Sequence, residues 1–72
     1  MNVGDTIRVP EKDYAFGSGT LTMKVEEVVS TASAGGERWA ELRGRDVRPD
    51  GSLAPTQRYA SVRVSAITVV SG

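Results

Sequence analysis

Apolar and polar residues alternate at both ends of the chain. Near the start, Val3, Ile7 and Val9 share one side of a period-two pattern, and polar residues fill the other side. Residues 59–70 repeat this pattern near the end. Because successive side chains of a strand point to opposite faces, both segments are predicted to be half-buried strands. Two such strands can pair and close a small β-barrel.

A long second strand is predicted over residues 20–30. Its apolar side chains occupy one face as far as Val25, and Glu27 then falls where the next apolar residue belongs. One extra residue near Glu26 and Glu27 restores the register, so we expect a β-bulge and a bent strand. The small residues that follow, 31–36, predict a flexible loop.

A hairpin is the clearest local feature. Two predicted strands, residues 38–47 and 53–64, flank the turn sequence Arg48-Pro-Asp-Gly-Ser52. Proline presets φ, aspartate bonds its own backbone and glycine accepts a positive φ. If these five residues are the whole connection, Trp39 pairs with Ser61 across the hairpin. One face of the hairpin is then small and apolar, and the other carries aromatic and arginine side chains.

The order of elements resembles a known superfold. A short 3₁₀ turn is expected at Ser65 and Ala66, before a last strand at Ile67–Val70. Together with the Val3-Gly-Asp-x-Ile-x-Val9 opening, the bent second strand and the hairpin, it resembles the SH3-like small barrels, which include SH3, Tudor and KOW modules. The resemblance implies an all-β, five-stranded SH3-like barrel over residues 1–72, with a shallow binding surface beside its loops. It transfers no functional residues, because the Ala-Leu-Tyr-Asp-Tyr signature and the glycine-centred KOW motif are absent.

Composition narrows the class of protein. A domain of 72 residues buries only roughly 60% of the surface that its unfolded chain exposes, so a deep enzymatic cleft is not expected. Without cysteine or histidine there is no disulfide, no thiolate or imidazole zinc ligand and no Ser-His or Cys-His pair. Adjacent Glu26 and Glu27 point to opposite faces of a strand. We therefore expect a non-enzymatic protein that needs no cofactor or metal.

The chain shows no apolar run of the ~18 residues that cross a membrane, and no targeting signal at its start. A cytoplasmic protein is therefore expected. Its nine basic and nine acidic residues cancel, but residues 1–30 carry three basic against five acidic side chains and residues 31–72 carry six against four. Seven of the nine basic residues are arginine, which reflects either a GC-rich genome or a use for planar donors.

One predicted strand face combines aromatic rings with guanidinium groups: Trp39, Tyr59, Arg43, Arg45 and Arg63. Binding sites for single-stranded nucleic acid use this mixture of stacking and phosphate contacts. The alternative is that Trp39 fills the core and the arginines pair with acidic neighbours on a solvated face. Zero net charge favours the alternative, because nucleic-acid-binding domains are usually basic.

The first long loop, residues 11–19, supplies two more aromatic side chains. Tyr14 and Phe16 are candidates to line, with Trp39, a groove for an extended peptide or a cage for a cation. Alternatively, one of them covers the open end of the barrel. Gly17-Ser-Gly19 is not followed by a predicted helix, so it lacks the context of a phosphate-binding loop.

Taken together, the sequence predicts a binding module that recognises a protein or peptide through the aromatic and arginine surface. A protein partner is favoured over nucleic acid because the net charge is zero, and no membrane partner is expected. A nucleic-acid-binding module that uses the same face is the first alternative. A structural subunit that assembles through the open edge of its second or last strand is the other, so the predicted state is a monomer or a weak homo-oligomer.

Overall fold

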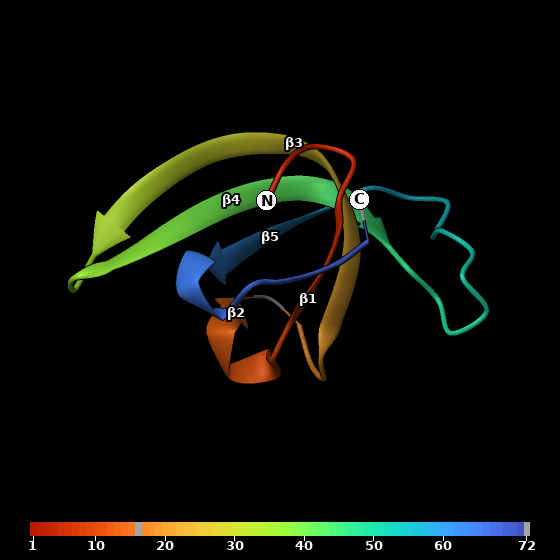
Figure 1. Ribbon diagram of the computed structural model, residues 1–72, viewed down its shortest axis with the longest axis horizontal. Helices are drawn as coiled ribbons and strands as arrows, with labels where there is room; N and C mark the ends of the chain where they lie inside the picture. Colours follow the sequence, from red (N-terminus) through yellow and green to blue (C-terminus); the bar gives the residue numbers. More distant parts are fainter. Residues whose placement is uncertain (16, 72) are drawn as a thin grey trace.

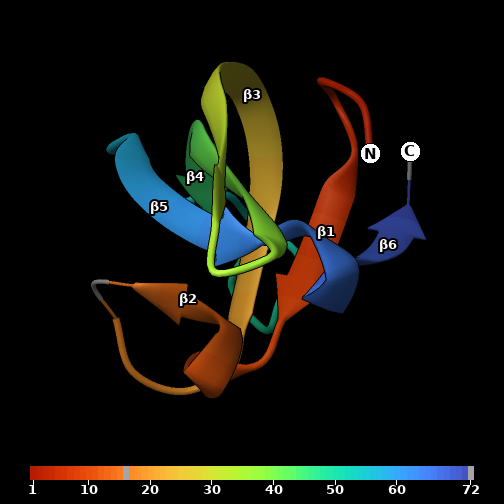
Figure 2. The same cartoon turned by 90° about the vertical axis from the view of Figure 1, so that its left-hand side faces the viewer.

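The computed structural model describes residues 1–15 and 17–71, which form one curled antiparallel sheet (Figure 1). Six strands lie in the order β2-β5-β4-β3-β1-β6, so β2 and β6 form the two ends of a half-barrel (Figure 2). No helix among the described residues is long and apolar enough to cross a membrane. The elements are β1 (Thr6–Val9), η1 (Glu11–Asp13), β2 (Tyr14–Ala15), β3 (Leu21–Ala34), β4 (Glu37–Asp46), β5 (Arg58–Arg63), η2 (Val64–Ala66) and β6 (Thr68–Ser71).

The all-β class is confirmed, but there are six strands where five were expected. The additional strand, β2, comes from the stretch predicted to be a loop, and it pairs with β5. At the other edge, β1 begins only at Thr6, and Val3 is 61% exposed rather than buried. Gly4 explains this difference: its φ of 97° turns the chain, and its N–H donates to the carbonyl oxygen of Val25.

The long, bent strand is confirmed in β3. Its register against β4 shifts between Val25 and Glu27, as predicted, and again between Val28 and Ser30. The predicted flexible loop over residues 31–36 is wrong for its first four residues, which continue β3. Only Gly35-Gly36 turns the chain, with φ values of 59° and 81°. Two residues with positive φ connect strands with the twist of a sheet, so glycines here favour a tight hairpin over a loop.

The hairpin turn is confirmed, but the predicted register of β4 against β5 is wrong by two residues. Val47 bridges Leu53 as expected, whereas Trp39 pairs with Arg63. The chain leaves the sheet after Ala54, whose N–H still donates to the carbonyl oxygen of Asp46 (2.8 Å), because Pro55 has no N–H to donate to a ladder. A shift of two residues leaves every side chain on its predicted face. The 3₁₀ turn before the last strand is also confirmed, as η2.

The hydrophobic core lies on the inner face of the sheet. Most of its side chains come from alternate positions of the strands, and Ala66 and Ile67 pack against them from η2 and the residue that follows it. In β1, β3, β4 and β5, this face has the apolar residues that the alternation predicted; Tyr14 of β2 was not predicted to belong to the core. The core residues are Ile7, Val9, Tyr14, Leu21, Met23, Val25, Ala40, Leu42, Ala60 and Val62.

Gly44 allows β3 and β4 to lie close together within this core. A Cβ atom at Gly44 would overlap the carbonyl oxygen of Lys24 and would lie 3.0 Å from the side chain of Met23. The main-chain oxygen belongs to a paired strand, so it cannot move away at low cost. The absence of a side chain at this position is therefore a packing requirement.

Arg45 attaches the excursion that begins at Pro55 and ends at Gln57 to the sheet. Its Nη1 donates to the carbonyl oxygens of Pro55 (2.7 Å) and Ala54 (3.4 Å), and its Nε donates to Glu26 Oε1 (3.2 Å). Gln57 Nε2 donates to the same carboxylate oxygen (2.6 Å). The planar guanidinium thus links β3, β4 and the chain before β5.

Replacing Gly44 with alanine is expected to destabilise the protein by about 1–3 kcal/mol, because the added methyl group overpacks the β3–β4 contact. Strand propensity alone predicts the opposite sign, a gain of about 0.5–1 kcal/mol. Urea denaturation measures the difference. Ser30→Ala, at an exposed position of β3, is the control and should change stability by less than about 0.5 kcal/mol. A stabilised Gly44→Ala protein would contradict the packing requirement.

Arg45→Ala is expected to cost about 1–3 kcal/mol of stability, because it removes charge-assisted hydrogen bonds to Glu26 and to two carbonyl groups. Arg45→Lys should not restore it, because one ammonium group does not reproduce the planar fork of donors. Arg38→Ala, which removes an exposed arginine of β4, is the matched control in the same denaturation experiment. Equal stabilities of Arg45→Ala and Arg38→Ala would show that the link contributes nothing.

Candidate functional site

The predicted aromatic and arginine surface lies on the outer face of β4 and β5. Cross-strand pairing places Trp39 beside Arg63 and Arg43 beside Tyr59. The guanidinium carbon of Arg63 lies 5.2 Å from the centre of the Trp39 ring, within the range of a cation–π contact. Trp39 is half-buried, whereas Tyr59 is 56% exposed. The structure therefore brings these side chains together in two adjacent pairs.

The arginines of this face are occupied by acidic neighbours. Each guanidinium lies against at least one carboxylate: three of the four contacts join neighbouring strands, and the fourth joins β5 to η1. Charge on this face is therefore largely balanced before any ligand arrives. The ion pairs are Arg43 with Glu27, Arg45 with Glu26 (3.2 Å), and Arg63 with Asp13 (3.3 Å) and Glu37 (3.6 Å).

Tyr14 does not share a surface with Trp39. It pairs with Val62 on the inner face and belongs to the core, while Trp39 lies on the outer face. The Tyr14 hydroxyl lies within hydrogen-bonding distance of the carbonyl oxygens of Gly19 (2.7 Å) and Ser18 (3.1 Å). Tyr14 thus fastens the loop that follows β2 over the core. Phe16, the other aromatic side chain predicted for this site, lies outside the described residues.

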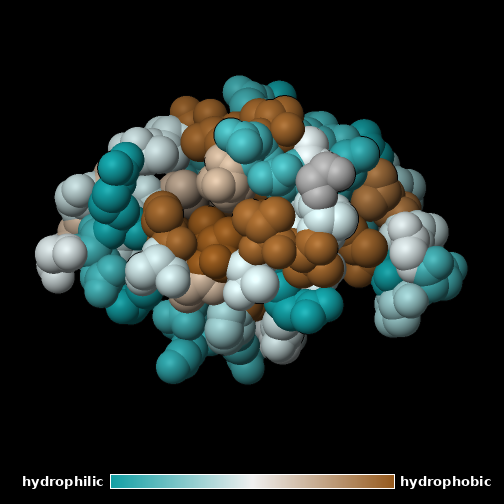
Figure 3. Space-filling view, viewed as in Figure 1, coloured by the Kyte–Doolittle hydropathy of each residue, from teal (hydrophilic) through white to brown (hydrophobic). Residues whose placement is uncertain are grey.

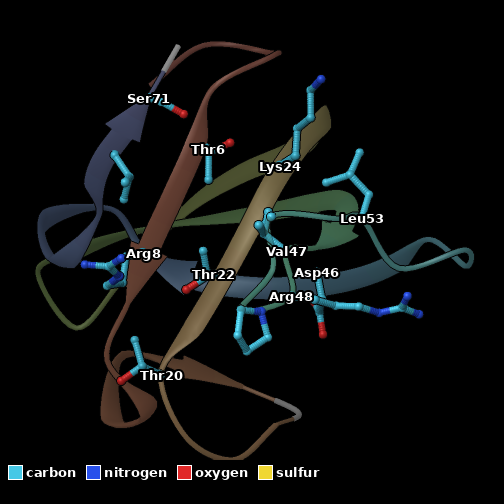
Figure 4. A pocket seen from close by; sticks show the side chains of 13 residues that line it. Thr6, Arg8, Thr20, Thr22, Lys24, Asp46, Val47, Arg48, Leu53 and Ser71 are labelled. Atoms are coloured by element: carbon cyan, nitrogen blue, oxygen red, sulfur yellow. The ribbon is translucent and has the colours of Figure 1, made fainter.

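A groove of about 880 Å³ lies elsewhere, on the outer face of β1 and β3 (Figure 4). Its floor consists of neighbouring side chains from these two strands, whose register pairs Thr6 with Lys24 and Arg8 with Thr22. Residues 47–53 form one wall and the end of β6 forms the other. The lining residues are Thr6, Arg8, Thr20, Thr22, Lys24, Asp46, Val47, Arg48, Pro49, Gly51, Leu53, Val70 and Ser71.

The groove is positively charged. Arg8, Lys24 and Arg48 form no ion pair among the described residues, whereas Asp46, the acidic residue in the lining, pairs with Arg58 (3.4 Å). Hydroxyl groups of Thr6, Thr20, Thr22 and Ser71 also line the groove. Lys24 also acts on its neighbour: a hydrogen bond from Gln57, aided by Arg45 and then by the charge of Lys24, lowers the pKa of Glu26. The groove therefore offers hydrogen-bonding groups and three cations outside any ion pair of the described residues, although Lys24 lies within electrostatic range of Glu26.

The wall that carries Arg48 is a well-ordered turn. The Gly51 N–H donates to the Arg48 carbonyl oxygen (2.8 Å), and Gly51 has a φ of 88°. Asp50 Oδ1 accepts hydrogen bonds from the Ser52 hydroxyl (2.6 Å) and the Ser52 N–H (2.9 Å), and these bonds lower the pKa of Asp50. The turn chemistry predicted from the sequence thus fixes the backbone from which the exposed Arg48 side chain extends (Figure 4).

None of the six described residues predicted for the site lines this groove, and the seventh, Phe16, lies outside the described residues. The alternation places Arg8 on the outer side of the first strand, but it does not place Lys24 and Arg48 beside it. That grouping depends on the pairing of β1 with β3 and on the path of residues 47–53, both of which join distant parts of the sequence. The only indication in the sequence is that each of these three segments carries one cation at a polar position.

Metal coordination finds no support in the part of the chain that the structure describes. Residues 1–15 and 17–71 contain no group of three or more His, Cys, Asp or Glu side chains placed to hold a metal ion.

Comparison with known proteins finds no matching family model, no matching curated protein and no matching solved structure.

Proposed function

We propose that this protein is a non-enzymatic binding module that accepts an acidic segment of a partner protein in the groove between β6 and residues 47–53. The observation that supports this function is the contrast between two sets of cations. Arg8, Lys24 and Arg48 share one groove and have no acidic partner among the described residues. The arginines on the outer face of β4 and β5 already have carboxylate partners.

An acidic ligand gains more from the free cations than from the paired ones. A carboxylate that meets Arg8 or Arg48 forms a charge-assisted hydrogen bond without displacing another carboxylate. At Arg63, the same carboxylate would compete with Asp13 and Glu37. The ordered turn at residues 48–52 lowers the entropy lost on binding, because part of the site is fixed before the ligand arrives.

The remaining lining favours a peptide over a nucleic acid. Val47, Leu53 and Val70 supply aliphatic surface, and no aromatic residue is among the described residues that line the groove. Proteins that bind single-stranded nucleic acid stack bases on aromatic rings and are usually basic, whereas this chain has zero net charge. A peptide segment that mixes acidic and aliphatic side chains matches both the cations and the aliphatic surface of the groove.

The SH3-like interpretation and a cytoplasmic location belong to the same proposal. Small barrels of that kind present shallow binding surfaces beside their loops. The segment at residues 47–53 has this position, because it connects β4 to the chain that leads into β5. The half-barrel described above supplies the sheet on which such a surface rests.

Fluorescence anisotropy with a labelled peptide of alternating glutamate and valine tests the proposal. The wild-type protein is expected to bind it, with an affinity that falls as salt is added. Arg8→Glu and Arg48→Glu should each weaken binding by about tenfold or more, because each replaces an attraction with a repulsion. Arg38→Glu is the matched control: it makes the same change of charge at an exposed position roughly 26 Å along β4 from Asp46.

Three results would contradict the proposal. Equal weakening by Arg38→Glu and by the groove variants would show that only net charge matters. Loss of binding in Tyr59→Ala together with normal binding in Arg8→Glu would move the site to the outer face of β4 and β5. Tighter binding of oligothymidylate than of the peptide, with the same dependence on Arg8 and Arg48, would identify the ligand as nucleic acid.

A further inference from the structure

The sheet has an unpaired edge inside its longest strand. β1 pairs with β3 only at residues 21–24, and the hydrogen bonds between Val25 and the chain at Gly4 and Asp5 end this contact. β3 nevertheless continues to Ala34, paired with β4 on its other side. We call residues 28–34 the free edge. All seven of these residues are exposed.

The free edge is a better template for another strand than either end of the sheet. β2 has only two residues and follows the charged η1. β6 has four residues, and its register against β1 is shifted. On the free edge, the register shift that leaves Val29 without a partner is followed by a regular run, Ser30–Ala34. Short strands and bulges protect an edge from pairing, and this run has neither protection.

Charge identifies the occupant. Glu26 and Glu27 are the last charged residues before the free edge, and no charged residue or proline follows until Glu37. Edge strands usually avoid self-association by carrying charges or proline. An uncharged edge meets a copy of itself without repulsion, whereas an acidic or a basic partner gains no charge attraction from it. Val28 and Val29, the first two residues of the free edge, are 37% and 41% exposed and give it apolar surface; Figure 3 shows apolar side chains over β3.

We infer that two copies of this chain form a weak dimer by antiparallel pairing of their free edges. Pairing the regular run Ser30–Ala34 with itself centres the two-fold axis on Ala32 and places Ser30 opposite Ala34 of the second copy. Val29 then lies opposite Gly35 of the second copy, where it loses exposure. The result is a continuous sheet through β3 of both copies, with an isologous interface. This inference is independent of the proposed groove.

Light scattering coupled to size-exclusion chromatography of the full chain gives the first test. The apparent mass should rise from that of one chain to that of two as concentration increases. Ala32→Lys should weaken the dimer by about tenfold or more, because it places two cations opposite each other at the axis. Thr68→Lys, which adds the same charge to β6, should not. A monomer at every concentration would overturn the inference, as would a dimer lost in Thr68→Lys and kept in Ala32→Lys.

Cross-linking tests the register. The chain contains no cysteine, so single substitutions report on one position each. Ala32→Cys should form an intermolecular disulfide rapidly, because residues opposite each other in an antiparallel pair have Cβ atoms about 4.5–5.5 Å apart. Ser30→Cys is the matched control, since its two copies are separated by four positions, roughly 13 Å. Equal rates of cross-linking in the two variants would overturn the proposed pairing.

Discussion

The pairing of β3 with β4 is the contact on which the rest of the structure depends. β1 attaches to β3 and β5 attaches to β4, and the outermost strands then attach to these two. The two register shifts in this pair bend the sheet, and Gly44 lets the two backbones lie close beside Met23 of the core. Without that bend, the inner faces of β1 and β5 would not meet across one set of side chains.

Because of the same bend, consecutive regions of β3 contact different parts of the molecule. Its first residues pair with β1, contribute to the core and carry Thr22 and Lys24 on the floor of the groove. Its middle residues, Glu26 and Glu27, neutralise arginines of β4. Its last residues have a neighbour on one side only. One strand thus contributes to the interior, to a charged groove and to an unpaired edge, and the bulges separate these regions.

Local chemistry explains what could be predicted from the sequence. Alternation identified the buried face of most strands, and the misplaced Glu27 indicated the first bulge. The turn at residues 48–52 has residues that specify its geometry. By contrast, β2 contains two residues, too few to show a period, and Pro55 ends a ladder without indicating how many residues leave it. The groove could not be predicted, because Arg8 and Arg48 lie on opposite sides of it, and strand pairing rather than spacing makes them line the same groove.

The topology also orders the steps of folding. β3, β4 and β5 follow one another as neighbours in the sheet, so their contacts close short loops and can form early. β6 pairs instead with β1, and a long loop must close to join Ile7 to Val69. This pairing is therefore expected to form after the transition state of folding, so that weakening it raises the unfolding rate more than it lowers the folding rate. Since β6 forms one wall of the groove, the groove is completed only after the central strands have assembled.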